Sequence, residues 1–496
     1  MSSQEIYVNQ VLQLLDGVDR GDFTGESDIP AQYTYGHLNA LFQLIDQLQN
    51  GQELFEKLYD RIVAFSKRKI QEKVSSGQKV RVAFLAISAA EWAADGIYRI
   101  LSQDERLECF VVMCPLVDRA QEERRKTEEQ SYHFFYNNHY DVRRIYRSED
   151  DTCAGWGQIG GLPDIAIHLT SWYQALPAAY QINQFPLNIL NCYLPYGMYV
   201  ADSLSGVYAK TAVYNKEMVN LMWRVYADSE ANLAGYARYG LLHAKNVRYS
   251  GFAKMDFFFE KKKYTEEQIR NIWKIPSEAG VNERKKIIIA PHHTIISCES
   301  VVFSTFARNA YFWLYLAKKY QDKISFIFKP HPNLRMKAIQ CGYFKSYEEY
   351  GAYIDTWQSL PNARVSDEEG YLDIFATSDG MIMDSASFLG EYLYVNKPML
   401  FLTREEQAFN ILGKKLVSGY YTARGEDFMA IEQFIERIIL KGEDSMKDIR
   451  SRIFAEELDY AGHNGCGASA FICNDIVKGC IETGTQKRIS DEADRT

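Results

Sequence analysis

A turn able to hold phosphate is the clearest chemical feature of this 496-residue sequence. In TSDGMIMDSASFLGEYLYVNKPMLFL (377–402), residues 380–384 predict a short buried strand and residues 387–395 an apolar helix. Ser385 and Ser387 fall where hydroxyls cap a helix. Such a turn directs free backbone N–H groups and two hydroxyls toward one point, which is how a helix N-terminus binds phosphate.

Histidines follow two further predicted strands. His331 is held between prolines in FKPHP after a strand that begins at 324, and His292 and His293 follow KKIIIAP. Each site taken singly has a structural explanation, as a satisfied core histidine or a helix cap. Three such strand ends in one α/β domain favour a phosphate-bearing ligand bound at the edge of the sheet.

Several other chemistries are not expected from the motifs. Gly155, Gly157 and Gly160 match G-x-G-x-x-G, but the match follows an acidic stretch and precedes a strand, so it predicts a loop rather than a dinucleotide site. The P-loop and G-x-S-x-G motifs are absent. Because neighbours along a strand point to opposite sides, a metal site built from both His292 and His293 is not expected.

Two series of alternating strands and helices must position these residues. Near-continuous apolar runs such as VRVAFLAIS and KKIIIA are typical of parallel strands covered on both faces. The pattern predicts an α/β protein with two doubly wound, Rossmann-type domains that face a cleft. The predicted parts are a helical N-terminal extension (1–78), an N-terminal α/β domain (79–255), a linker (256–284), a C-terminal α/β domain (285–443), C-terminal helices (444–483) and a disordered tail (484–496).

Composition limits the partners. A net charge of −9 argues against general nucleic-acid binding, which needs a basic surface. Nine cysteines and an N-terminus without a signal-peptide pattern indicate a reducing, cytoplasmic setting. No apolar stretch reaches the roughly 20 residues of a membrane helix. A soluble or peripheral protein is expected.

The sequence blocks also resemble a known family. APHHTI, STFARNAYFWLYLAKKY, FKPHP and SDGMIMDSASFLGEYLYVNKPMLFL are similar, in order and spacing from about 285 to 402, to the C-terminal half of the CDP-glycerol glycerophosphotransferases. That family includes teichoic acid and capsule polymerases of the GT-B fold. The N-terminal half agrees more weakly, through DIAIHLTSWYQALPAAY, NCYLPYG and RYSGFAKMD.

The resemblance implies roles for individual residues. His331 resembles the histidine that contacts the donor diphosphate, with Lys329 beside it. Asp384 and Ser387 match the aspartate and second serine of an Asp-Tyr-Ser-Ser block, and Glu391 matches an acidic residue near the donor ribose.

Two departures from the family pattern matter. Ser385 and Ala386 replace the tyrosine and first serine of that block. Family polymerases also carry His-Gly-Thr-Pro, with the histidine as general base, where this chain has Leu194-Pro195-Tyr196-Gly197. Tyr196 and Gly197 are therefore the expected acceptor-side residues. A tyrosine of ordinary pKa is a poor base near neutrality, so His292 or His293 supplies the base, or the acceptor differs, or the protein is no polymerase.

The leading hypothesis is transfer of glycerol- or ribitol-phosphate from a CDP-activated donor to a glycan or lipid-linked hydroxyl, with release of CMP and without a cofactor. The resemblance places this reaction at the cytoplasmic face of the membrane, through a peripheral contact. One alternative is a GT-B glycosyltransferase that uses a nucleotide sugar. Another is a non-catalytic partner that binds nucleotide or glycan.

Overall fold

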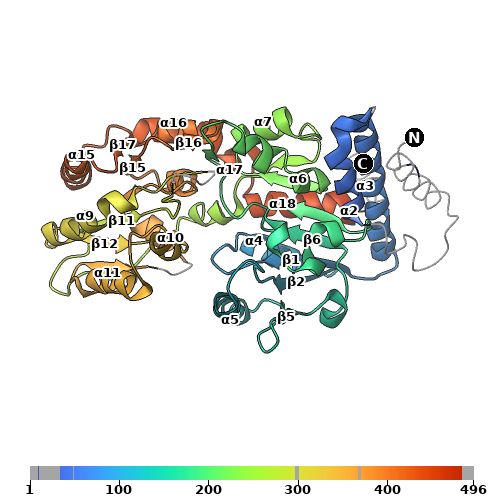
Figure 1. Cartoon of the computed structure of the whole chain (residues 1–496), viewed down its shortest axis with the longest axis horizontal. Helices are drawn as coiled ribbons and strands as arrows, with labels where there is room; N and C mark the ends of the chain where they lie inside the picture. The colour runs from blue at the N-terminus through green and yellow to red at the C-terminus, as the bar shows by residue number, and fades with distance from the viewer. Residues whose placement is uncertain (1–8, 10–33, 49, 297–300, 367–369, 483–496) are drawn as a thin grey trace, which may run out of the picture.

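The computed structural model describes Asn9 and residues 34–48, 50–296, 301–366 and 370–482. Two α/β domains lie next to each other along the long axis of the molecule, the N-terminal domain on the right of Figure 1 and the C-terminal domain on the left. The predicted fold class is confirmed. Residues 1–8 and 10–33 of the predicted helical extension, and the whole predicted tail (484–496), lie outside the described residues.

Seven parallel strands form the sheet of the N-terminal domain within the described residues, in the order β10-β9-β7-β6-β1-β2-β3. A short antiparallel pair, β4 and β5, lies outside this sheet. The strands are β1 (Val80–Ala86), β2 (Leu107–Met113), β3 (Val142–Arg144), β4 (Tyr146–Arg147), β5 (Thr152–Cys153), β6 (Ile165–His168), β7 (Leu190–Tyr193), β9 (Arg224–Ala227) and β10 (Val247–Tyr249).

Both faces of this sheet are covered. Alternate residues of a strand point to opposite faces, so Val82 and Phe84 join one apolar cluster while Ala83 and Leu85 join another. The helices of this half are α2 (Tyr35–Leu44), α3 (Gly51–Ser75), α4 (Asp95–Leu101), α5 (Gln121–Asn137), α6 (Glu217–Leu221) and α7 (Glu230–Tyr239). Buried residues of α2 and α3 belong to the second cluster, so these helices cover the N-terminal domain.

The C-terminal domain has a parallel sheet of six described strands in the order β13-β12-β11-β14-β15-β17. Its strands are β11 (Lys285–Ala290), β12 (Ile324–Phe328), β13 (Ala363–Val365), β14 (Gly380–Met383), β15 (Met399–Thr403) and β17 (Tyr421–Arg424). Its helices are α8 (Glu266–Ile272), α9 (Phe306–Lys319), α10 (Leu334–Gln340), α11 (Tyr347–Ser359), α12 (Leu372–Thr377), α13 (Phe388–Glu391), α14 (Ile411–Val417) and α15 (Phe428–Gln433).

The C-terminal helices return to the N-terminal domain. α16 (Lys447–Glu457) still packs on α14 of the C-terminal domain, the chain crosses over through α17 (Tyr460–Asn464), and α18 (Ala468–Ile476) lies among the N-terminal elements in Figure 1. Asp256, in the segment between the two sheets, accepts hydrogen bonds of 2.8 Å from the backbone N–H groups of Ala468 and Ser469 at the start of α18. Asp475 near its end pairs with Arg224 of β9 at 2.7 Å.

A two-stranded ribbon joins the two domains. β8 (Ala201–Asp202) of the N-terminal half pairs antiparallel with β16 (Ala408–Phe409) of the C-terminal half. Asn410, directly after β16, donates through its amide to the Tyr199 carbonyl at 2.7 Å and to the Tyr214 hydroxyl at 3.1 Å. The two sheets are therefore held in a defined relative position.

Several elements differ from the sequence predictions. The short strands β3, β9, β13 and β17 were not predicted, because their apolar runs are brief or carry arginine and tyrosine. The residues after the first strand of the N-terminal domain predict a helix over 91–101, but this helix begins at Asp95, which leaves Glu91 in a loop. The helix predicted over 387–395 is four residues of α-helix followed by a 3₁₀ turn (Tyr392–Val395). Within the described part of the chain, no helix has the length and apolar character needed to cross a bilayer.

The docking of the C-terminal helices can be tested at Gly251. Its φ is +80°, and a Cβ there would lie 1.9 Å from Cδ1 of Tyr460, the first residue of α17. Gly342 is a matched control, because its φ is +75° and no atom lies within 4 Å of its Cβ position. We expect Gly251→Ala to lower the free energy of unfolding by about 2–5 kcal/mol and Gly342→Ala by about 1–2 kcal/mol, in chemical denaturation. If both variants lose the same free energy of unfolding, the close packing at Tyr460 does not contribute to stability.

Candidate functional site

Three neighbouring strand ends bring the predicted donor-side residues together. β12 and β14 flank β11, so the segments that follow these strands meet at one edge of the sheet. The Lys329 N–H donates to the Ile289 carbonyl at 2.8 Å, and the His331 N–H donates to the Pro291 carbonyl at 3.1 Å. These two bonds continue the sheet pairing past the strands and fix His331 beside the His292–His293 segment.

The three histidines form one cluster. Their ring centroids are 4.3 Å apart for His292 and His293, 5.1 Å for His292 and His331, and 4.0 Å for His293 and His331. One ring nitrogen of each lies within 4.8 Å of those of the other two. The prediction that His292 and His293 point to opposite sides is therefore wrong. They lie beyond Ala290, the last residue of β11, where the alternation of a strand no longer holds.

Backbone contacts define which nitrogens of this cluster carry hydrogen. The Asn333 N–H donates to Nδ1 of His331 at 3.1 Å, and the Thr294 N–H donates to Nδ1 of His292 at 3.3 Å. Since an N–H can only donate, both Nδ1 atoms accept, and in the neutral rings both Nε2 atoms carry the hydrogen. Nδ1 of His293 is buried without a hydrogen-bond partner among the described residues. Two imidazole N–H donors in one cluster suit an anion better than a cation.

The cluster is uncharged near neutral pH. Burial lowers the pKa of His293 to about 4, with help from the charges of Lys337 and Arg119. Burial and the neighbouring histidines also hold the pKa of His292 well below its usual range. Burial also holds the pKa of His331 well below its usual range, and His293, Lys329 and Arg119 lower it further. A bound diphosphate would oppose these effects and favour protonation.

Asp384 connects the chain segments at this edge of the sheet. Its carboxylate is 1% exposed and accepts hydrogen bonds from the His292 N–H at 2.6 Å and from the Thr305 hydroxyl at 2.7 Å. Burial raises the pKa of Asp384 to about 6, although these hydrogen bonds and the charge of Arg404 act against the rise. The sequence predicts Asp384 as a donor-binding residue. In the structure its carboxylate oxygens accept hydrogen bonds from protein groups, and these bonds position the histidine segment.

Ser385 and Ser387 lie on the turn that follows β14. Neither hydroxyl has a hydrogen-bond partner among the described residues, and Ser387 precedes α13 without capping it through its side chain. The predicted cap is therefore wrong, because residue 387 already has helical φ and ψ angles (−63° and −36°). With a four-residue α13, the helix dipole contributes little here. The two hydroxyls remain available for a ligand.

Glu391 belongs to a buried polar group beside the histidines. It is 2% exposed and accepts a hydrogen bond from the Tyr371 hydroxyl. Burial raises its pKa, and the charges of Lys254 and Lys329 act in the opposite direction. The ammonium groups of Lys254 and Lys329 lie 4.4 Å and 5.6 Å from the centroid of the Tyr371 ring.

The N-terminal domain reaches this edge at several points. A Cβ on Gly197 would lie 3.7 Å from Cβ of Ser387, so the predicted acceptor-side turn faces the predicted phosphate turn. Burial, followed by the charge of Glu91, raises the pKa of Tyr196 above its ordinary value. Arg119, in the loop between β2 and α5, donates to the Asn333 side chain at 3.3 Å.

Sequence reasoning missed Arg119, Lys254 and Tyr371. Arg119 lies in a loop, Lys254 in a 3₁₀ helix (Ala253–Phe258) and Tyr371 directly before α12, and their approach depends on how the two domains meet, which no local pattern records. The only available signal was position: Arg119 follows the second strand of the N-terminal domain, and loops after parallel strands line the cleft of doubly wound folds.

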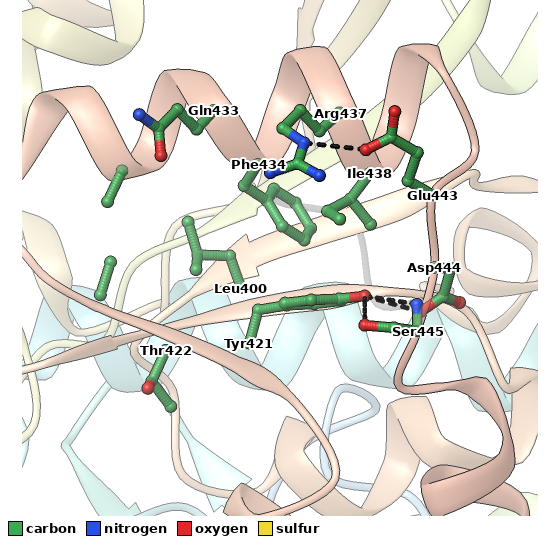
Figure 2. A pocket seen from close by; sticks show the side chains of 12 residues that line it. Leu400, Tyr421, Thr422, Gln433, Phe434, Arg437, Ile438, Glu443, Asp444 and Ser445 are labelled. Carbon is green, nitrogen blue, oxygen red and sulfur yellow. Dashed lines mark hydrogen bonds and ion pairs between the residues drawn. The ribbon is translucent and has the colours of Figure 1, made fainter.

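A separate groove lies at the edge of the C-terminal sheet. Figure 2 shows this space of 720 Å³ between β17 and the helix that continues α15, with the Arg437–Glu443 ion pair at its rim. None of the predicted site residues lines it, and β17 is three strands away from β11. The groove carries no cluster of catalytic side chains, so the histidine edge is the candidate active site.

Solved structures with the same arrangement of domains define the fold class. The wall teichoic acid polymerase TagF, in a variant with a histidine replaced by asparagine, superposes with a TM-score of 0.52 at 11% identity, covering 90% of this chain and 97% of that chain. The same variant soaked with CDPG for 30 minutes gives 0.51 at 12% identity, covering 90% and 96%. The chain has a GT-B-type fold.

The family resemblance found in the sequence is confirmed for the central part of the chain. Residues 214–422 match the family model described as CDP-glycerol:poly(glycerophosphate) glycerophosphotransferase. No curated protein matches the chain. The matched segment contains the histidine cluster and both serines, whereas Tyr196, Gly197 and Arg119 precede it.

The neutral state of the histidines predicts a pH dependence of stability. Folded His293 stays neutral down to about pH 4, whereas an unfolded histidine is protonated below about 6.5. The unfolded state therefore binds the extra proton between these values, and stability falls as the pH falls. We expect His293→Gln to reduce this acid-side loss by up to about 3 kcal/mol between pH 6.5 and 4, measured by denaturant titration. His133→Gln, at an exposed position on α5, should leave the loss unchanged.

Proposed function

We propose that the protein transfers glycerol- or ribitol-phosphate from a CDP-activated donor to a hydroxyl of a glycan or lipid-linked acceptor, releasing CMP. The observation that carries this proposal is the cluster of His292, His293 and His331, within the segment that matches the glycerophosphotransferase family. Neutral imidazole N–H donors next to free hydroxyls suit a diphosphate. The biological setting would be the synthesis of a cell-surface polymer of the teichoic acid or capsule type.

The chemistry asked of the donor side is positioning and charge neutralisation. In phosphoryl transfer the attacking and leaving oxygens stand in line, and negative charge spreads over the transferred group. The N–H donors of His292 and His331 and the hydroxyls of Ser385 and Ser387 would hold the diphosphate oxygens. Lys329 would add positive charge, and Asp384 would keep the His292 segment in place through its bond to the backbone.

No resident cofactor is part of this proposal. A metal ion needs a nitrogen lone pair, but Nδ1 of both His292 and His331 already accepts a backbone N–H and Nε2 carries hydrogen. The donor side would therefore act through hydrogen bonds rather than through a bound divalent ion. Turnover should persist after dialysis against EDTA, and its loss with recovery on adding Mg²⁺ would contradict this part of the proposal.

The acceptor would approach from the N-terminal domain. Tyr196 and Gly197 face the phosphate turn from that side, which is the place for a glycan or lipid-linked hydroxyl. Such an acceptor implies that the protein works in the cytoplasm against the inner face of the membrane, in peripheral contact with it. Flotation with vesicles that carry the acceptor would test this setting.

A donor panel tests the reaction itself. We expect CMP release from CDP-glycerol or CDP-ribitol that depends on an added acceptor. Release of UDP or CMP from nucleotide sugars alone would instead indicate a glycosyltransferase. Tight CDP binding without turnover on any donor and acceptor would indicate a binding protein.

His331 is the sharpest single test of the donor site. Because it would supply a hydrogen bond that strengthens as charge develops, His331→Ala should lower acceptor-dependent CMP release by about 100-fold or more. His133→Ala, on the exposed face of α5, is the matched control and should keep wild-type turnover. Near-normal activity of His331→Ala, with a normal melting temperature, would remove His331 from the donor site.

A further inference from the structure

An acidic side chain that the donor site does not use lies in the loop after β1, an inner strand of the N-terminal sheet. β1 ends at Ala86 and α4 begins at Asp95, so Glu91 lies between them, at the carboxyl end of a strand flanked by β6 and β2. The Glu91 N–H donates to the Ser88 hydroxyl at 3.3 Å, which fixes the turn. This edge of the N-terminal sheet is the one that carries Tyr196, two strands away.

Two cations place Glu91 opposite the donor site. The Lys254 ammonium donates to the Ala90 carbonyl at 3.3 Å and lies 4.4 Å from the centroid of the Tyr371 ring, whose hydroxyl binds Glu391. The charge of Lys254 thus acts on both Glu91 and Glu391.

Arg119 makes the second connection. It donates to Asn333, two residues after His331, and its charge lowers the pKa values of Glu91, His293 and His331. Through Lys254 and Arg119, the Glu91 loop is linked to both ends of the donor edge. The Glu91 loop therefore lies on the N-terminal side of the interdomain contact that Lys254 makes with Ala90 and Tyr371.

The Glu91 carboxylate is not used by the protein itself. Within the described residues it has no hydrogen-bond partner and no ion pair, although Arg119 and Lys254 are near enough to affect it. Burial raises its pKa to about 7, against the opposing effect of these two cations. The charge of Glu91 in turn raises the pKa of Tyr196. A carboxyl group that titrates near neutrality can accept a proton under physiological conditions.

The other candidates for the base are weaker. His292 accepts at Nδ1 from the backbone and carries its hydrogen on Nε2, so it has no free lone pair. His293 has a pKa of about 4 and is a poor proton acceptor at neutral pH. Tyr196 has its pKa raised by burial and by Glu91, which keeps it protonated.

We propose that Glu91 is the general base that accepts the proton of the acceptor hydroxyl. This inference rests on the proposed transfer reaction. The acceptor oxygen forms a bond to the phosphorus that carries the polyol, and its hydrogen passes to the Glu91 carboxylate. The bond from that phosphorus to the bridging oxygen breaks, and CMP leaves with the electron pair. Glu91 then returns the proton to water, so charge and atoms balance.

The test combines pH, binding and chemical rescue. Acceptor-dependent CMP release is measured from pH 5.5 to 9 for the wild type, Glu91→Gln, Glu91→Ala and Glu123→Gln, together with CDP affinity by calorimetry. Glu123 pairs with Arg119 at 3.5 Å and is exposed, so Glu123→Gln controls for a change of charge beside that arginine. We expect Glu91→Gln to lose 100-fold or more in turnover and to lose the rise in rate around pH 7, while CDP affinity stays within threefold.

Added formate should restore part of the turnover of Glu91→Ala, because a small carboxylate can occupy the space that the side chain leaves. Retained turnover in Glu91→Gln, or an unchanged rise near pH 7, would overturn the assignment while leaving the transfer reaction in place. An equal loss in Glu123→Gln would also overturn it and would assign the effect to Arg119. Absence of acceptor-dependent release by the wild type, from every CDP-polyol, would overturn the transfer reaction and the base together.

Discussion

The donor edge depends on one buried carboxylate. Asp384 follows β14 and bonds to the His292 backbone after β11 and to Thr305 at the start of α9, so three chain segments are joined at one point. These bonds are costly to break, since a buried carboxylate left unpaired loses its hydration without compensation. The orientation of His292, and through it the spacing of the whole cluster, follows from this one group.

The site is completed only where the two domains meet. The ribbon of β8 and β16 and the amide of Asn410 hold the sheets in register, and Arg119 and Lys254 then reach across to the donor edge. Each domain contributes what the other lacks. The C-terminal domain offers neutral hydrogen-bond donors, and the N-terminal domain offers an unpaired acid. In the proposed reaction, this division separates diphosphate binding from proton transfer.

The sequence predicted which strand ends of the C-terminal domain lie together, but it predicted few of the N-terminal residues that approach them. Long apolar runs marked β11, β12 and β14, and the residues after them lie at one edge because parallel strands end together. Two details failed for local reasons: His292 and His293 lie past the strand, and α13 is too short to bind phosphate through its dipole. Glu91 was not predicted as a site residue because AEWAADGIYRIL predicts a helix that begins four residues before the observed start at Asp95.

The return of α18 to the N-terminal domain has a consequence for how the protein is made. Ile472, Cys473 and Ile476 complete the same apolar cluster as Ile97 and Leu101 of α4. The ribosome makes these residues after both sheets, roughly 10–45 s after the rest of the N-terminal domain at ordinary rates of synthesis. During that interval the part of the apolar cluster that α18 covers stays exposed, although α4 already packs on the same cluster, so the N-terminal domain is incomplete until the C-terminal helices are made. The order of synthesis thus makes the two halves fold as one unit.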